Sequence, residues 1–138
     1  MKEAIAILTG GGPAPGMNTV VGSVAKTFLA KGYRVIGLHY GYSGLFNSNP
    51  RFEDLDFVKS DFIFNQGGSY LTMSRFKPTD KDFEENFNLS FFQDNNIKLL
   101  VTVGGDDTAS TANRIAEFLE AKQYPIANIH VPKTIDND

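Results

Sequence analysis

The sequence contains no cysteine or tryptophan, no strong excess of one charge, and no apolar run long enough to cross a bilayer. Without cysteine there are neither disulfides nor thiolate metal sites, which suits a reducing compartment. A net charge of −3 over 138 residues leaves no basic surface for nucleic acid or an acidic membrane. Because the apolar start at residues 5–8 is too short for a secretory signal, we expect a cytoplasmic protein.

What is present is the composition of an ordinary globular domain. Hydrophobic residues make up 41% of the chain and charged residues 21%. A chain of this length corresponds to one domain that can bury a real core. There is no internal repeat, linker or low-complexity tract, so no domain boundary is predicted within residues 1–138.

Strand patterns alternate with helix patterns along most of the chain. Continuous apolar runs predict buried strands over 4–8 and 99–103, the second within a strand over 97–103, and further strands are predicted over 33–38 and 126–131. Helical spacing predicts helices over 17–31, 79–95 and 108–122. The alternation predicts an α/β domain of three αβα layers, Rossmann-like, with a mostly parallel sheet. The segment 41–78 lacks a clean period, and there we expect short extended pieces that cover the sheet.

A glycine-rich loop, residues 10–16, follows the first predicted strand. Its spacing does not fit the dinucleotide pattern G-x-G-x-x-G, no acidic residue ends the next strand, and no Gly-Lys-Ser/Thr follows as in a P-loop. Four glycines in seven residues exceed what one tight turn requires. We therefore favour a loop that presents bare backbone to a phosphate or another polar ligand, with a plain turn as the alternative.

A second glycine turn, Gly104-Gly105, separates a buried strand from a predicted helix that opens with Asp106 and Asp107. The start of a helix offers unpaired N–H groups and a positive dipole end to phosphate. Two carboxylates there would repel a phosphate unless a cation lies between them, so the pattern suggests a metal-bound phosphate. An aspartate cap after a glycine turn explains the same residues without a ligand.

Two further segments carry polar groups of interest. A third glycine turn, 66–69, leads to Arg75, for which a phosphate partner is plausible beside other glycine loops. In an extended tail Asp136 and Asp138 would face the same way, so one could accept a proton while the other stabilises a metal or hydrogen bond. A solvated acidic tail is the alternative. Ligands of such sheets lie at the carboxyl ends of the strands, so we expect the loops 10–16, 104–108 and 132–138 on one rim.

Five motifs, in this order, make the chain resemble the 6-phosphofructokinases. They are Gly11-Gly-Pro-Ala-Pro-Gly-Met-Asn18, Gly41-Tyr-Ser-Gly-Leu45, Gly67-Gly-Ser-Tyr-Leu-Thr-Met-Ser-Arg75, Gly104-Gly-Asp-Asp-Thr108 and Pro132-Lys-Thr-Ile-Asp-Asn-Asp138. The resemblance covers essentially the whole chain. It implies Mg²⁺-assisted phosphoryl transfer to the 1-hydroxyl of fructose 6-phosphate, giving fructose 1,6-bisphosphate in glycolysis, by an enzyme that is a homo-oligomer in its full-length form.

The resemblance also implies roles for individual residues. Asp136 resembles the base that accepts the hydroxyl proton, and Thr134 and Asp138 resemble the neighbours that hold substrate and transition state. The expected donor-binding residues are Gly11, Gly12, Tyr42, Arg75, Gly105, Asp106, Asp107 and Thr108. Among these, Arg75 would bridge the donor and acceptor phosphates, and Asp106 would position Mg²⁺. These roles match the general needs of phosphoryl transfer.

Two positions bear on the identity of the donor. Asp107 and Lys133 occupy places where ATP-dependent members typically carry glycine, and this pair is associated with pyrophosphate-dependent enzymes. The side chain of Asp107 would clash with and repel an α-phosphate, whereas Lys133 would add positive charge for the smaller donor. We therefore expect pyrophosphate, with ATP as the alternative.

The chain is much shorter than the family it resembles. Family members are more than twice as long, and a second lobe supplies much of the grip on the sugar phosphate. We expect residues 1–138 to be the donor-binding half, a fragment or truncated product, and inactive or nearly so because it lacks a closed cleft that excludes water. A non-catalytic phosphate or nucleotide sensor is an alternative of another class. Lipid and NAD kinases, which lack the segment 134–138, rank lower.

Overall fold

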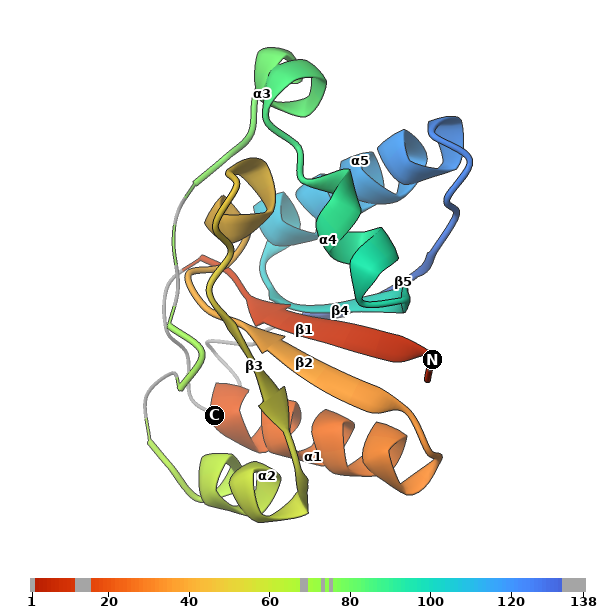
Figure 1. Cartoon of the computed structure of the whole chain (residues 1–138). Helices are drawn as coiled ribbons and strands as arrows, with labels where there is room; N and C mark the ends of the chain where they lie inside the picture. The colour runs from red at the N-terminus through yellow and green to blue at the C-terminus, as the bar shows by residue number, and fades with distance from the viewer. Residues whose placement is uncertain (1, 12–15, 68–69, 73, 75, 133–138) are drawn as a thin grey trace.

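The computed structural model describes residues 2–11, 16–67, 70–72, 74 and 76–132. These form a five-stranded sheet in the order β3-β2-β1-β4-β5, with helices on both faces (Figure 1). The strands are β1 (Ala4–Thr9), β2 (Arg34–Leu38), β3 (Phe52–Leu55), β4 (Ile97–Gly104) and β5 (Ala127–Pro132). The helices are α1 (Met17–Ala30), η1 (Ser43–Phe46), α2 (Phe57–Phe64), α3 (Asp80–Glu85), α4 (Leu89–Asp94) and α5 (Asp106–Ala121). The predicted α/β fold is confirmed.

The centre of the sheet is the pair β1 and β4. Every residue of β1 is buried, as its unbroken apolar run predicts. Successive side chains point to opposite faces, so Ala6 and Leu8 join the core under α4 and α5, whereas Ile5 and Ile7 join the core against α1 and α2. β1 pairs in parallel with β2 and β4, and β4 with β5, whereas β3 is antiparallel to β2.

The crossover helices begin at glycines on the carboxyl edge of the sheet. Gly16 precedes α1 with φ of 82°, a left-handed conformation that glycine adopts without strain. Gly105 precedes α5, which starts at Asp106, two residues before its predicted start. Asp106 and Asp107 therefore occupy the first turn, where carboxylates interact favourably with the helix dipole.

The segment predicted as extended pieces contains a helix. β3 is extended, but residues 57–64 form α2, whose N-cap Asp56 accepts a hydrogen bond from the Lys59 amide. α2 packs directly on α1, since a Cβ at Gly22 would lie 2.8 Å from the Cβ of Phe64. The periodicity was obscured because the exposed side of α2 is also apolar. Its exposed apolar side chains are Phe57, Val58, Phe62 and Phe64.

The predicted helix over 79–95 is in fact two short helices, α3 and α4. Thr79 begins α3 with a capping box completed by Asp82. The chain leaves the helix at Asn86, and the Asn88 side chain caps α4 by accepting from the Phe91 amide. The break arises because asparagines compete with the helical backbone for hydrogen bonds. The phenylalanines of both helices still enter the core, as predicted.

Candidate active site at the carboxyl edge of the sheet

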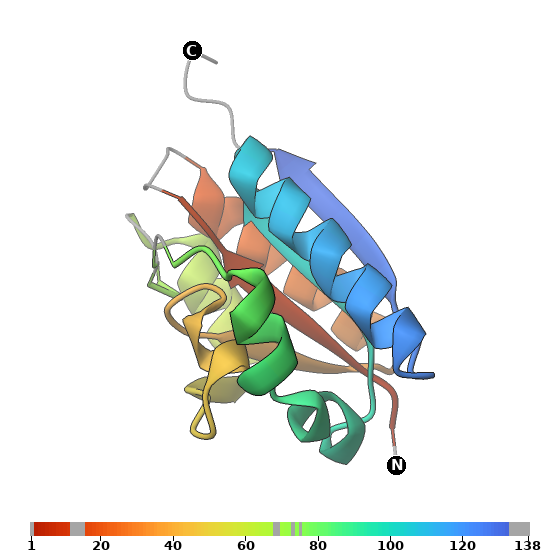
Figure 2. The same cartoon turned by 90° about the horizontal axis from the view of Figure 1, so that it is seen from above.

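The ends of β1, β4 and β5 lie side by side. The Gly10 amide donates to the Val103 carbonyl at 2.9 Å, and Gly104 is opposite Pro132 in the sheet register. Figure 2 shows the first turns of α1 and α5 on the same side of the molecule as the end of β5. The predicted common rim is thus confirmed for the parts of the three loops that the structure describes.

Thr108 fixes how closely the first two glycine turns approach each other. A Cβ added to Gly10 or to Gly104 would lie 2.5 Å from the Thr108 hydroxyl oxygen, a distance that real Cβ atoms do not reach. The Thr108 side chain is buried between them. Glycine at both positions is therefore a packing requirement, independent of any ligand.

Tyr42 connects the segment after β2 with the start of α5. Its hydroxyl donates to the Thr108 carbonyl at 2.6 Å, and its side chain is buried. Burial raises the pKa of Tyr42 well above its ordinary value of 10.0, and the nearby Thr102 hydroxyl offsets only part of that rise. The phenol therefore remains protonated and remains a donor at all physiological pH values.

A small pocket of about 90 Å³ opens at the rim. It is lined by Gly10, Gly11, Tyr42, Ser74, Phe76, Lys77, Asp107, Thr108 and Thr111. Four expected donor-binding residues therefore share one pocket. Gly10 belongs to the predicted loop 10–16, and the other four lining residues, Ser74, Phe76, Lys77 and Thr111, were not predicted as site residues. The first three lie in the aperiodic segment 41–78, and Thr111 is one helical turn after Thr108.

The charges at the pocket belong to the start of α5 and to Lys77. Asp106 and Asp107 are exposed in the first turn, and no side chain caps the helix at Gly105. Lys77 Nζ lies 3.6 Å from Asp107 Oδ1, and both side chains are largely exposed. Such an ion pair contributes about 0–1 kcal/mol to stability, so neither group is firmly held by it.

Asn18 joins the first glycine motif to the third. Its Nδ2 donates to the carbonyls of Gln66 and Gly67 at 2.9 and 3.1 Å, and its Oδ1 accepts from the Tyr70 amide at 2.8 Å. The side chain is buried, with 3% of its surface exposed. No role was predicted for Asn18 from the sequence, although a polar residue on the inward face of α1 indicates one.

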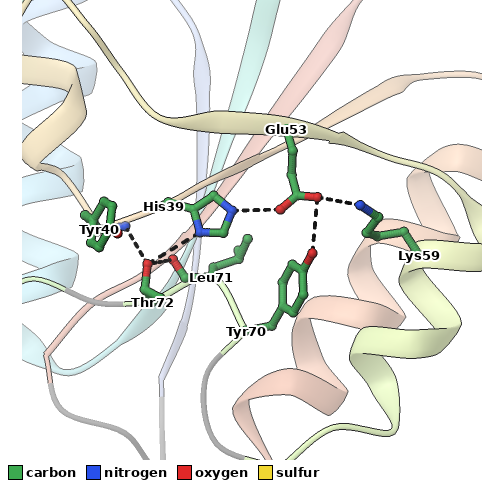
Figure 3. A network of polar contacts seen from close by, with 7 residues as sticks. All are labelled: His39, Tyr40, Glu53, Lys59, Tyr70, Leu71 and Thr72. Atoms are coloured by element: carbon green, nitrogen blue, oxygen red, sulfur yellow. Dashed lines mark hydrogen bonds and ion pairs between the residues drawn. The ribbon is translucent and has the colours of Figure 1, made fainter.

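A polar network holds the segment 70–72 against β2 and β3 (Figure 3). Glu53 contacts His39 Nε2 at 2.7 Å, Lys59 Nζ at 2.8 Å and the Tyr70 hydroxyl at 3.2 Å. Burial opposes ionisation of Glu53, but the hydrogen bonds from Lys59 and His39 outweigh it and lower its pKa. The Thr72 hydroxyl accepts from the Tyr40 amide at 3.1 Å. The sequence pattern had not indicated this network.

The remaining predicted site residues lie outside the residues that the structure describes. They are Gly12, Arg75, Lys133, Thr134, Asp136 and Asp138. Their roles therefore remain predictions.

The described residues do not form a metal site by themselves. Within 2–11, 16–67, 70–72, 74 and 76–132 there is no group of three or more His, Cys, Asp or Glu side chains placed to hold an ion. Mg²⁺ commonly binds through one or two carboxylates together with substrate phosphates and water. The exposed Asp106 fits that mode of binding, in which the donor supplies the other ligands.

The fold and rim define a class of protein. The chain is a doubly wound α/β domain whose glycine turns open two helices at the carboxyl edge of the sheet, where this class binds its ligands. The phosphofructokinase family model matches residues 4–138, and the chain belongs to that family.

Relatives with both kinds of donor in their names match the chain. It is 38% identical over 139 residues to a pyrophosphate–fructose 6-phosphate 1-phosphotransferase of Thermotoga maritima, and the match covers 100% of this chain and 32% of that protein. It is 37% identical to an ATP-dependent 6-phosphofructokinase of Tolumonas auensis, with 100% and 41% covered. The chain therefore spans roughly a third of the length of these relatives.

The fold is also found in a solved structure of this family. The phosphofructokinase of Saccharomyces cerevisiae matches 99% of this chain, and 20% of its own, with a TM-score of 0.84 at 21% identity. Among the described elements, no helix combines the length and the apolar character that a membrane span requires.

Proposed function

We propose that residues 1–138 form the phosphoryl-donor-binding domain of a phosphofructokinase, with a second lobe outside this chain. The reaction is transfer of a phosphoryl group from pyrophosphate to the 1-hydroxyl of fructose 6-phosphate, giving fructose 1,6-bisphosphate. The observation that carries the proposal is the pocket in which Gly10 and Gly11 face Asp107 and Thr108 at the start of α5.

This pocket suits a short phosphate chain. Gly11 has φ of 77° and brings backbone without a side chain to the pocket wall. The first N–H groups of α5 have no intrahelical partners and carry the positive end of the helix dipole. Asp106 would meet a Mg²⁺ ion brought by the donor, and that ion would neutralise phosphate charge, as in phosphoryl transfer generally.

The acceptor side of the site is assigned by family membership. β5 ends at Pro132, opposite Gly104, so the motif 132–138 starts at the rim. We assign Asp136 as the base that takes the proton of the sugar hydroxyl, with Thr134 and Asp138 as its neighbours on the substrate. Arg75 bridges the two phosphates, and Lys133 adds positive charge next to the donor.

Pyrophosphate is the donor that the pocket favours. The two kinds of relative match the chain at similar identity, so overall identity does not distinguish the donors, whereas Asp107 does. Its carboxylate lines the pocket from the first turn of α5, where the α-phosphate of ATP would meet a like charge in place of bare backbone. The alternative is an ATP-dependent enzyme.

Calorimetric titration of the chain with pyrophosphate and with ATP, each in excess Mg²⁺, tests both proposals. We expect pyrophosphate to bind and ATP to bind more weakly, and we expect Asp107→Gly to narrow that difference. Asp94→Gly, at the end of α4, is the matched control, since it removes the same charge away from the pocket. Tighter binding of ATP by the unaltered chain contradicts the assignment of the donor, and binding of neither contradicts the proposed site.

A further inference from the structure

His130 contacts the second glycine turn from the neighbouring edge strand. It lies on β5, with Nε2 3.1 Å from the Gly104 carbonyl oxygen and Nδ1 2.8 Å from the Thr102 hydroxyl. A carbonyl oxygen can only accept, so the proton of this hydrogen bond is on Nε2. In the neutral ring Nδ1 then accepts from the Thr102 hydroxyl.

The imidazole meets the backbone where β4 ends. In the register of β4 and β5, Gly104 and Pro132 are paired as the last residues of their strands. Gly104 is followed by a second glycine, and neither residue has a side chain that could contribute a hydrogen bond to the turn. Thr108 packs against Gly104, and the His130 ring adds a polar contact to its carbonyl.

Holding this carbonyl also orients the next amide. The peptide unit is planar and trans, so the Gly104 C=O and the Gly105 N–H point in opposite directions within one plane. A ring that holds the carbonyl on the β5 side therefore directs the N–H away from β5. Gly105 is the N-cap of α5, and its amide is the first that the turn can offer to a phosphate.

The other ring nitrogen of His130, Nδ1, is held by the Thr102 hydroxyl. Thr102 is fully buried, and its hydroxyl lies close to the buried phenol of Tyr42, which donates to the Thr108 carbonyl. His130 and Tyr42 thus bind the two carbonyls that flank residues 105–107, one from β5 and one from the segment after β2.

We infer that His130 is a positioning residue for the phosphoryl donor: its Nε2–H, bonded to the Gly104 carbonyl, aligns the Gly105 amide with the donor phosphate. The inference rests on the proposed function, because it assumes that the donor binds at this turn. His130 does not itself touch the donor.

Two variants separate the hydrogen bond from the bulk of the ring. His130→Leu removes the donor, whereas His130→Gln replaces it with a side-chain N–H at a similar distance from the backbone. We expect His130→Leu to weaken binding of Mg²⁺-pyrophosphate roughly 2- to 10-fold, the loss typical of one hydrogen bond, and His130→Gln to restore most of it. Ile129→Thr is the control, because Ile129 directly precedes His130 on β5, is half exposed and lies outside the pocket.

The tautomer provides a measurement that does not depend on ligand. Long-range ¹⁵N–¹H spectra of the imidazole should show the proton of His130 on Nε2 at neutral pH, and the ¹⁵N shift of Gly105 should move in His130→Leu and return toward the native value in His130→Gln. A proton on Nδ1 overturns the inference.

The binding results distinguish two kinds of failure. If the unaltered chain does not bind Mg²⁺-pyrophosphate, the proposed function is wrong and this inference falls with it. If the chain binds but both His130 variants bind as tightly as the native protein, the inference alone is wrong. Equal weakening in both variants also overturns it, because the ring and not its N–H then matters.

Discussion

At the scale of single residues, the rim depends on groups that touch backbone and not ligand. Thr108 packs between two glycines, Tyr42 binds its carbonyl, and Asn18 satisfies three backbone groups of another loop. Each of these side chains is buried, so water cannot replace a partner that moves away. Movement of a glycine turn would therefore leave buried polar atoms without hydrogen bonds. The positions of the glycine turns are thereby set before any ligand arrives.

Replacement of Asn18 should destabilise the protein substantially. Asn18→Ala removes three hydrogen bonds and leaves their backbone partners beneath the loop, so we expect the free energy of unfolding to fall by about 2–4 kcal/mol. Urea denaturation followed by circular dichroism measures this. Asn18→Asp is the matched comparison, because it keeps the acceptor for the Tyr70 amide but turns a carboxylate oxygen toward two carbonyls. A loss below about 1 kcal/mol in the alanine variant would show that water replaces the side chain.

The contact of Gly10 with Thr108 can be measured by a double-mutant cycle. In Gly10→Ala the three atoms nearest the new methyl group all belong to the Thr108 side chain, and we expect overpacking to cost about 1–3 kcal/mol. Thr108→Ala removes the two closest of those atoms. Gly10→Ala should therefore cost clearly less in the Thr108→Ala background, and additive losses of stability would contradict the close packing described at the rim.

At the scale of elements, the strands were more predictable than the connections between them. β1 and β4 follow from continuous apolar runs because both faces of a central strand are covered by helices. α2 was missed because its outward face is apolar, so neither helical nor strand period stands out. The helix predicted over 79–95 breaks at Asn86 and Asn88, where the Asn88 amide donates to the Leu45 carbonyl, a long-range contact that local pattern does not report.

In the candidate site, too, the residues at the strand ends were predictable and those from the connecting segment were not. The rule that ligands bind at the carboxyl ends of parallel strands predicted the common rim from Gly10, Gly104 and Pro132. Ser74 and Lys77 come to the pocket from an aperiodic segment, whose path depends on Asn18 and on the network around Glu53. Such contacts are set by tertiary packing, and a single sequence does not reveal them.

The network around Glu53 should make stability depend on acidity. The pKa of Glu53 is lowered in the folded state, so its contribution is present above the unfolded value of about 4.5 and is lost as pH falls through the lower folded value. We expect thermal stability to decline below about pH 4.5 and this decline to be smaller in Glu53→Gln. Glu85→Gln, an exposed carboxylate at the end of α3, is the control. An identical decline in native protein and Glu53→Gln would contradict the shift.

At the scale of the whole molecule, the proposed function makes this chain one wall of a site that has two. The pocket between Gly10, Tyr42 and α5 is small and lies at the surface rim, and the relatives are roughly three times as long as the matched segment. Phosphoryl transfer to a sugar requires that water be excluded, and excluding water requires a cleft with two sides. Under the proposed function, we therefore expect this chain to bind the donor without catalysing the transfer.

We expect the 138-residue chain to bind Mg²⁺-pyrophosphate without measurable phosphorylation of fructose 6-phosphate, in a coupled assay with either donor. In a longer protein that carries this chain, Asp136→Asn should lower kcat by roughly 10²- to 10⁴-fold, as loss of a general base does, while binding of the donor persists. Asp94→Asn, at the end of α4, gives the comparison for charge alone. Robust turnover by the short chain would contradict its expected inactivity. An unchanged rate in Asp136→Asn would contradict the assignment of Asp136 as the base.

The reach of Asn18 has a consequence for how this sequence can change over time. Its side chain forms hydrogen bonds with the main chain of Gln66, Gly67 and Tyr70, which lie 48, 49 and 52 positions further along the sequence. We therefore expect the connection to survive substitutions that keep the path of the loop's backbone, and to be lost when an insertion or deletion changes the length of the loop. Residue 18 and that length should then vary together among related sequences.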